Sequence, residues 1–311
     1  MSHAYLFPGQ GSQSIGMLAE LAGVYPEVKQ TFEQGSEILQ QDLWSLVSAG
    51  PDEELNRTEN TQPIMLCASI AVWRIWVKQF SNSAEFVAGH SFGEYSALVC
   101  AGVLDFESVV PLARFRGEVM QEAVPVGQGA MAAVLGLDND KLADVCSQVS
   151  QGEVVEAVNF NAPGQVVIAG DSAAVSRAID AAKEAGAKRA VILPLSVPSH
   201  SSLMQSAANK LRDYLSDITF NVSDVSVIHN ADVQAHASEQ DIKDALYRQL
   251  FNPVRWVETI QHMVSQDVQT FIELGPGKVL TGLSKRIDKS VPCYGVYDIK
   301  SLEQALEIVQ G

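Results

Sequence analysis

Short apolar runs alternate with longer stretches of helical periodicity along much of the chain. Residues 3–7 (HAYLF) and 85–89 (EFVAG) are apolar runs of strand length, each followed by turn-forming residues. Residues 61–80 have the length and apolar content of a buried helix, and residues 93–102 (GEYSALVCAG) begin another. Strands that alternate with helices in this way predict an α/β fold with a parallel sheet.

The middle of the chain has a different pattern. Between residues 129 and 195 the order is strand, helix, strand, strand, helix, strand, with Asp138 or Asn139 as the N-cap of the first helix. This order is that of a ferredoxin-like unit. We therefore predict a ferredoxin-like subdomain at 127–196, inserted into a larger α/β subdomain formed by residues 1–126 and 197–311.

The last third of the chain returns to alternating helices and strands. Residues 202–217 predict a helix, and residues 225–230 and 268–275 predict strands. A further helix within 238–256 has to end before Pro253, because proline cannot continue it. These elements would complete the larger subdomain.

Composition argues against several classes of function. The chain has 311 residues and a formal net charge of −16, whereas a nucleic-acid-binding protein needs a basic surface to neutralise phosphates. The same charge argues against an anionic membrane as a partner. No apolar run approaches the roughly 18 residues of a membrane span, and the first residues lack the basic and apolar regions of a signal peptide. We expect a cytoplasmic protein.

The cysteines show neither a metal site nor a disulfide framework. None forms a Cys-x-x-Cys pair, and no cluster with histidine has the spacing of zinc ligands. They are typical of buried thiols in a reducing compartment, so we expect neither a bound metal nor a redox cofactor. The four are Cys67, Cys100, Cys146 and Cys293.

The stretch Gly89-His90-Ser91-Phe92-Gly93 fits the G-x-S-x-G motif of a nucleophilic serine. A serine at a sharp turn from a strand to a helix projects above the sheet, and the flanking glycines leave room for the turn. The helix that follows directs its free N–H groups at the same point, which suits an oxyanion. Because the required strand and helix are both predicted, we interpret Ser91 as a nucleophile rather than a structural turn residue.

A serine hydroxyl needs a base, and the candidates are six histidines. His200 lies in the loop LPLSVPSHSSLM at the predicted junction of the two subdomains, where catalytic groups are often found. His90 adjoins the serine, and neighbouring side chains at such a turn diverge. Of the other histidines, His3 is interpreted as a terminal residue and His229 as a structural one. His236 and His262 are interpreted as surface residues. Position alone leaves the choice of His200 open.

Seven segments in order resemble one family over essentially the whole chain. They are FPGQGSQ, GHSFGEYSALVCAG, RFRGEVMQ, NFNAPGQVVIAG, VPSHSSLM, QLFNPVRW and ELGPGKVLTGL. The chain thereby resembles the malonyl-CoA:acyl-carrier-protein transacylases of bacterial fatty-acid synthesis and the acyltransferase domains of polyketide synthases. The resemblance implies an α/β-hydrolase-like larger subdomain, malonyl-CoA as substrate and acyl carrier protein as partner.

The resemblance also implies roles for single residues. Ser91 would carry the acyl group, and His200 would be its base and then the acid for the leaving thiolate. A backbone carbonyl, that of Gln249, would hold the other nitrogen of His200 in place of an aspartate. Gln10 and the backbone N–H of Phe92 would form the oxyanion hole. A further residue, an arginine in RFRGEVMQ, would bind the malonyl carboxylate.

That arginine is Arg116, and helical periodicity supports the choice. It falls within an apolar stripe between Val110 and Ala123, whereas Arg114 lies roughly on the opposite face. An arginine on a core-facing stripe is uncommon unless it meets an anion. The anion is either an internal Asp or Glu or a substrate carboxylate bound by two parallel hydrogen bonds. The second interpretation favours malonyl over acetyl.

Two departures from the family pattern bear on the acyl group. Phe92 stands where leucine is common, but only its backbone N–H is required. Residues 197–200 read Val-Pro-Ser-His, whereas polyketide relatives with His-Ala-Phe-His tend to use malonyl and those with Tyr-Ala-Ser-His methylmalonyl. This segment therefore does not identify the acyl group. The segment GQGSQ is not a phosphate-binding loop, because Ser14 breaks the G-x-G-x-x-G pattern and no Walker lysine follows. A plain turn remains the alternative, and we favour Gln10 as an N–H donor to the oxyanion.

Two other classes of function remain. A serine thioesterase or esterase would use the same serine, histidine and oxyanion hole, but we find no triad acid in hydrolase order. A non-catalytic docking module has no need of Ser91 and His200. Because a carrier protein is expected to be acidic, docking needs a local basic patch, for which Lys188–Arg189 and Lys285–Arg286 are hypothetical candidates. We expect a monomer.

Overall fold

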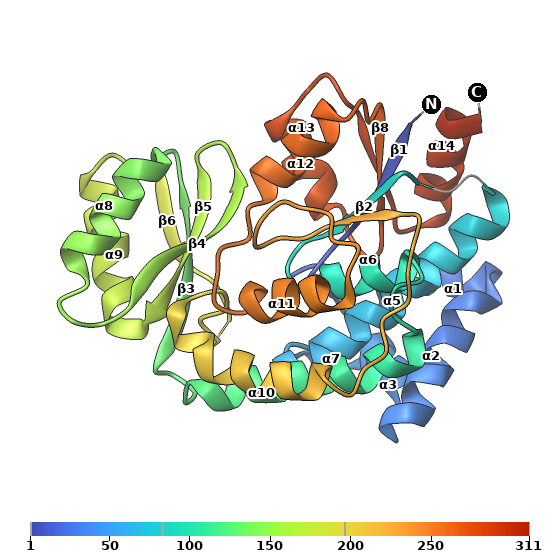
Figure 1. The fold of residues 1–311 in the computed structure, drawn as a ribbon, viewed down its shortest axis with the longest axis horizontal. Coiled ribbons are helices and arrows are strands. Elements are labelled where there is room, and N and C mark those ends of the chain that lie inside the picture. Colours follow the sequence, from blue (N-terminus) through green and yellow to red (C-terminus); the bar gives the residue numbers. More distant parts are fainter. Residues whose placement is uncertain (1, 82–83, 196, 311) are drawn as a thin grey trace.

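The computed structural model describes residues 2–81, 84–195 and 197–310. Figure 1 shows a larger part on the right, with a parallel sheet surrounded by helices, and a smaller unit on the left. The parallel sheet has the order β7 (Ser226–Ile228), β2 (Phe86–Gly89), β1 (His3–Phe7), β8 (Thr270–Leu274), β9 (Cys293–Val296). The chain is therefore a mixed α/β protein with a parallel sheet, as the alternating pattern predicted.

Helices cover both faces of the parallel sheet, so strand β1 is buried along its whole length (Figure 1). Helix α5 is the central helix, and nearly all of its residues from Thr58 to Trp76 are buried. The helices of the larger part are α1 (Ala19–Val24), α2 (Pro26–Leu39), α3 (Leu43–Ala49), α4 (Asp52–Leu55), α5 (Thr58–Gln79), α6 (Gly93–Cys100), α7 (Phe106–Ala123), α10 (Gln205–Leu215), α11 (Glu239–Gln249), α12 (Trp256–Ser265), α13 (Val279–Ile287) and α14 (Ile299–Gln310), with a 3-10 turn at Ser202–Met204.

The smaller unit is an antiparallel sheet with two helices on one face. Its strand order is β4 (Val155–Ala162), β5 (Gln165–Asp171), β3 (Gly129–Leu135), β6 (Arg189–Ile192), and all pairings are antiparallel. Helices α8 (Asn139–Val149) and α9 (Ser172–Glu184) cover its outer face (Figure 1). The Asp138 side chain caps α8 by accepting backbone hydrogen bonds, which decides between the two predicted N-caps.

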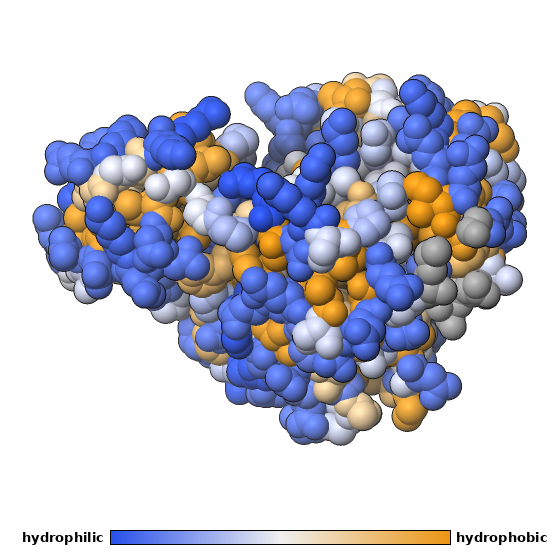
Figure 2. All heavy atoms as spheres, turned by 90° about the horizontal axis from the view of Figure 1, so that it is seen from above, coloured by the Kyte–Doolittle hydropathy of each residue, from blue (hydrophilic) through white to orange (hydrophobic). Residues whose placement is uncertain are grey.

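The smaller unit is joined to the larger part by main-chain hydrogen bonds. The N–H of Val254 donates to the carbonyl of Val158 at 2.8 Å, and the N–H of Phe160 donates to the carbonyl of Val254 at 3.0 Å. Strand β4 thus pairs locally with the segment that follows helix α11. Figure 2 shows the surface hollowed between the two parts when the molecule is seen from above.

The order of the parallel strands places three loops together. Strand β1 pairs with β2, and β2 pairs with β7, so the loops after Phe7, Gly89 and Ile228 leave the same edge of the sheet. On the opposite side of β1, the sheet continues with β8 and β9, so the strand order reverses its direction at β1. Ligands of α/β proteins bind at such a switch point, beyond the carboxyl ends of the strands.

Several elements differ from the sequence prediction. Strand β9 and helix α14 were not predicted, nor were helices α1 to α4, of which α2 has 14 residues. Strand β4 continues to Ala162, so the turn predicted over Asn161 to Gly164 is confined to its last two residues. The helix within 238–256 ends at Gln249, which confirms the prediction that it stops before Pro253. In the described part of the chain, no helix is long and apolar enough to cross a bilayer.

Candidate active site

Ser91 lies in a strained turn between β2 and α6. Its φ is 53°, a value that L-residues rarely adopt outside functional turns. A Cβ on Gly89 would lie 1.9 Å from the carbonyl of Gly93, and a Cβ on Gly93 would lie 2.1 Å from the carbonyl oxygen of Phe7. Both glycines are therefore required by the close approach of backbone segments around the serine.

The turn brings Ser91 to His200 from the other half of the larger part. The Oγ of Ser91 lies 2.7 Å from Nε2 of His200. Nδ1 of His200 lies 2.7 Å from the backbone carbonyl of Gln249, which can only accept, so Nδ1 carries the proton and Nε2 accepts from the serine. This is the orientation that a general base needs.

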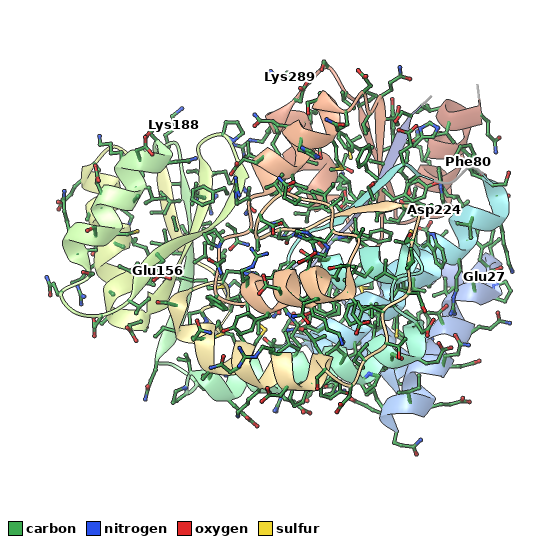
Figure 3. All side chains as sticks on the ribbon, in the orientation of Figure 1. Glu27, Phe80, Glu156, Lys188, Asp224 and Lys289 are labelled. Atoms are coloured by element: carbon green, nitrogen blue, oxygen red, sulfur yellow. The ribbon has the colours of Figure 1, made fainter. Side chains whose placement is uncertain are left out.

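The loop that carries His200 is held from both parts of the molecule. His200 has a φ of 68°, and its N–H donates to the carbonyl of Leu250 at 2.9 Å. Glu156 of strand β4, labelled in Figure 3, accepts hydrogen bonds from the N–H and hydroxyl of Ser202 at 2.8 and 2.7 Å. These contacts place the imidazole at the junction of the two sheets.

The environment of His200 favours its neutral form. Burial lowers the pKa of His200 to about 3, and the nearby charge of Arg116 contributes in the same direction. The hydrogen bond to the Gln249 carbonyl opposes this shift, and His90 adds a further small decrease. A neutral imidazole can take the Ser91 proton without first losing one of its own.

Two backbone N–H groups beside Ser91 have no acceptor among the described residues. They belong to Gln10, in the loop after β1, and Phe92, the residue after the serine. The side chain of Gln10 is held at 3.3 Å from the Thr58 hydroxyl. Free N–H groups at such a position suit the oxygen of a tetrahedral intermediate.

Arg116 is 1% exposed, yet it forms no ion pair among the residues that the structure describes. Its Nη1 and Nη2 donate to the side-chain oxygens of Gln62 and Gln249, both at 2.9 Å, and its Nε–H has no acceptor in the described chain. Burial lowers the pKa of Arg116, whereas Tyr95 and Glu94 raise it. The internal carboxylate partner considered from the sequence is not found there, and donors remain for another anion.

One cavity brings the candidate residues together. It has a volume of about 60 Å³, and its lining includes Gln10, Ser91, Phe92, Arg116 and His200. Gln249 does not line it, because its contribution to His200 is a buried carbonyl. Five of the six residues proposed from the sequence therefore line one small cavity, and the sixth, Gln249, contacts His200 from behind it.

Two larger hollows share residues with this cavity. One has a volume of about 570 Å³ and is lined mainly by polar residues between 53 and 59, together with Gln121, Val126, Pro194 and Leu195. The other has a volume of about 160 Å³ and includes His90, Asn159 and Asn161. Both include Gln10 and Leu195, which also line the small cavity, so the three hollows adjoin one another.

Comparison with known proteins gives the family. The profile described as "Acyl transferase domain" matches residues 4–303. The chain belongs to this acyl transferase family. It is 52% identical over 305 residues to the malonyl CoA-acyl carrier protein transacylase of Escherichia coli K12, covering 98% of this chain and 99% of the relative. The protein of the same name from Bacillus subtilis is 46% identical, covering 99% and 97%.

Solved structures agree with this membership of the acyl transferases. A complex described as a type II polyketide synthase acyl-carrier protein with its malonyl-transacylase matches with a TM-score of 0.98 and 52% identity, covering 99% of this chain and 100% of the other. An acyl carrier protein S-malonyltransferase from Vibrio cholerae matches with a TM-score of 0.95 and 53% identity, covering 98% and 100%.

Sequence reasoning missed several polar residues that this acyl transferase buries around its site. Gln62 is in the apolar run that predicted α5, and its 1% exposure shows that it faces the interior. Glu94 and Asn230 are completely buried, and Asn230 accepts a hydrogen bond from the Ser91 N–H at 2.7 Å. For Gln62 and Glu94, the sequence signal of a buried polar residue was a single glutamine or glutamate within an apolar helical run.

The remaining histidines of this acyl transferase do not contact Ser91 Oγ. His90 lies 2.7 Å from the Asn161 Oδ1, and burial lowers the pKa of His90. His229 is fully buried against Glu94, which fits its structural interpretation. His236 is bonded to Asp232 and is only partly exposed.

Other sequence predictions for the acyl transferase concern its thiols and surface. The four cysteines are unpaired, and Cys67 and Cys146 are buried. Cys100 and Cys293 are partly exposed as residues, but burial raises the pKa of both thiols, which agrees with the prediction of buried thiols. Lys188, on the smaller unit in Figure 3, is exposed, as is Lys285 on the larger part.

Proposed function

We propose that the protein transfers the malonyl group of malonyl-CoA to the phosphopantetheine thiol of acyl carrier protein, supplying extender units for fatty-acid synthesis. Full-length identity to malonyl CoA-acyl carrier protein transacylases supports the reaction. The single observation that carries the site assignment is the cavity in which the Ser91–His200 pair faces Arg116, a buried guanidinium without a carboxylate partner in the described chain.

The proposed mechanism is ping-pong transfer through a malonyl-serine ester. Nε2 of His200 takes the Ser91 proton while Oγ attacks the thioester carbonyl, and the N–H groups of Gln10 and Phe92 stabilise the oxyanion. The imidazolium then gives its proton to the CoA thiolate as the intermediate collapses. The carrier thiol attacks the ester in the reverse sense and releases Ser91. The reaction as proposed uses no metal and no redox cofactor.

We assign the acyl preference to Arg116. Its free donors can hold the malonyl carboxylate through two parallel hydrogen bonds, and acetyl-CoA has no group that would meet them. The Gln62 and Gln249 oxygens that bind its other donors are neutral, so they leave the positive charge to the substrate. Gln249 also holds the His200 ring through its carbonyl.

The finer fold assignment is likewise a proposal. We assign residues 1–126 and 197–311 to an α/β-hydrolase-like subdomain and residues 127–196 to an inserted ferredoxin-like subdomain. The strand-turn-helix around Ser91 supports the first, and the antiparallel order β4-β5-β3-β6 supports the second. The cytoplasmic location and the monomeric state remain predictions.

Docking of the carrier protein has to work against the net charge of −16. The exposed pair Lys188–Arg189 is one candidate patch. In the other pair, Arg286 donates to the Gln165 side chain of the smaller unit, so Lys285 is the freer of the two. If reversing the charges of either pair leaves the carrier KM and its salt dependence unchanged, that pair does not form the docking site.

The test is the intact mass of the protein after brief mixing with malonyl-CoA, with acetyl-CoA and methylmalonyl-CoA in parallel. We expect a malonyl adduct that is absent in Ser91→Ala and disappears when carrier protein is added. Free CoA without an adduct would mean that water reaches the ester, and a thioesterase would replace the transferase. Because one similar structure is a polyketide complex, carriers of both pathways should be compared.

A further inference from the structure

A second layer of buried polar groups lies beneath Ser91 and His200, with the Glu94 carboxylate at its centre. Glu94 is 0% exposed in the first turn of α6. Its Oε1 accepts from Nδ1 of His229 at 2.7 Å, and its Oε2 accepts from the N–H of Asn230 and from Nε2 of Gln249, both at 2.9 Å. Neither Glu94 nor His229 lines the cavity, so this layer does not touch substrate.

The Gln249 amide lies between Glu94 and Arg116 and satisfies both in only one orientation. Its Nε2 donates to Glu94, and its Oε1 accepts from Nη2 of Arg116 at 2.9 Å. A carboxylate only accepts and a guanidinium only donates. A flipped amide would therefore place two acceptors against each other on one side and two donors on the other. Glu94 thus selects the rotamer that presents an oxygen to Arg116.

We propose that Glu94 is a positioning residue that sets the acyl preference by fixing the Gln249 amide and, through it, Arg116. This inference rests on the proposed binding of the malonyl carboxylate by Arg116. With Gln249 held, the guanidinium is fixed between two amide oxygens, those of Gln62 and Gln249, and its free donors keep one direction. A buried group that never meets the substrate would then decide which acyl group reacts.

The same carboxylate also supports the nucleophile turn. Gln249 Nε2 donates to the Ser91 carbonyl at 3.0 Å as well as to Glu94. Asn230, whose N–H is held by Glu94, accepts from the Ser91 N–H and donates to the Gly89 carbonyl, both at 2.7 Å. Loss of this support would slow transfer of every acyl group alike, whereas the path through Arg116 concerns only acyl groups with a carboxylate.

The test substitution is Glu94→Gln, which keeps the shape but adds an N–H₂ group that can donate to a flipped Gln249. We expect the ratio of kcat/KM for malonyl-CoA to kcat/KM for acetyl-CoA to fall roughly tenfold or more, the worth of one charge-assisted hydrogen bond. The rates are those of acyl-enzyme formation by the full chain, followed by rapid quench and intact mass. Glu94→Asp keeps an acceptor-only group and should keep the ratio within about threefold.

Glu273→Gln is the matched control. Glu273 is also 0% exposed, and it accepts from the N–H of Leu280 and from the N–H and hydroxyl of Thr281. It caps helix α13, and none of these three hydrogen bonds involves a residue assigned to the site. Its replacement by an amide should lower thermal stability without changing the malonyl-to-acetyl ratio, which separates a structural cost from an effect on selectivity.

Repeating Glu94→Gln in an Arg116→Met background tests whether Glu94 acts on the acyl preference through Arg116. We expect Arg116→Met alone to lower the ratio and Glu94→Gln to change it no further. The role of Glu94 is overturned if Glu94→Gln leaves the malonyl-to-acetyl ratio unchanged, or if it lowers that ratio as much in the Arg116→Met background as in the original protein. In either case the proposed function stands. An unchanged ratio in Arg116→Met overturns the role of Glu94 together with the assignment of the acyl preference to Arg116. If Glu94→Gln does not fold, Gln249→Met is judged by the same ratio, and no change there overturns the proposal.

Discussion

Replacing Arg116 with methionine should remove the preference for malonyl-CoA. Methionine keeps most of the side-chain volume and lacks the guanidinium, so the cavity is not emptied. The guanidinium is 1% exposed, and its desolvation is therefore completed on folding rather than on substrate binding. Two charge-assisted hydrogen bonds to the substrate are worth about 3–6 kcal/mol, which predicts a loss of roughly 10² to 10⁴ in kcat/KM for malonyl-CoA.

The assay is the rate of acyl-enzyme formation with malonyl-CoA and with acetyl-CoA. Acetyl transfer should be unchanged or faster in Arg116→Met, because an apolar wall replaces an unpaired charge beside the acetyl methyl group. Arg114→Met is the matched control on the same helix. Arg114 is half-buried and donates to Asn60 and Gln41, away from the cavity, so its replacement should change neither rate.

The reasoning fails on either of two results. Malonyl and acetyl rates that fall by the same factor would show that Arg116 supports the fold or the His200 pKa rather than the carboxylate. A malonyl rate that falls less than about fivefold would show that another cation binds the carboxylate, since even one charge-assisted hydrogen bond is worth more. Unfolding by urea, measured in parallel, separates a loss of folded protein from a loss of binding.

Further predictions concern the pKa of His200 and two glycines. Because the pKa of His200 is lowered to about 3, it stays neutral in the folded protein, so the acylation rate should remain flat from pH 7 to about pH 4; an inflection near pH 6.5 in stopped-flow acylation would contradict this. Unfolded His200 takes up its proton below about pH 6.5, so the free energy of unfolding should decrease as pH falls from there toward 3. Gly93→Ala places a Cβ 2.1 Å from the Phe7 carbonyl oxygen and should destabilise the fold by about 3 kcal/mol or more. Gly282→Ala, with no atom within 4 Å of its Cβ in helix α13, should instead stabilise by about 0.5–1 kcal/mol; equal urea midpoints for the two variants would refute the steric argument.

The nucleophile turn could be predicted from sequence because its determinants are local. The strand, the two glycines and the helix that shape the Ser91 turn lie within a few residues of it, and each has a distinct pattern. Arg116 could be placed for a similar reason, since its neighbours at helical spacing show which face is buried. The contacts that these side chains make could not be predicted from such local patterns.

The contacts of the site depend on long-range topology. Arg116 and Gln249 are separated by 133 residues, and Gln249 and Ser91 by 158. No periodicity relates such positions, and only the family resemblance suggested Gln249. Gln62 was hidden for a different reason: one glutamine in a long apolar helix barely changes its pattern, although a buried amide there needs a partner.

The elements missed at the ends of the fold have weak local signals. Strand β9 has only four residues, is mostly half-buried and contains Gly295, which weakens a strand pattern. It lies at the edge of the parallel sheet, where pairing with β8 rather than intrinsic preference determines it. Tertiary context therefore decides this strand.

The main-chain bonds between β4 and Val254 limit how the enzyme can adapt to different substrates. They lie a few residues after Gln249, the residue that holds the His200 ring and Arg116. Swinging the smaller unit outward would break these bonds and disturb the segment that aligns the base. We therefore expect the site to adjust to different acyl groups through the side chains that line its cavity, while the two units stay joined by these bonds.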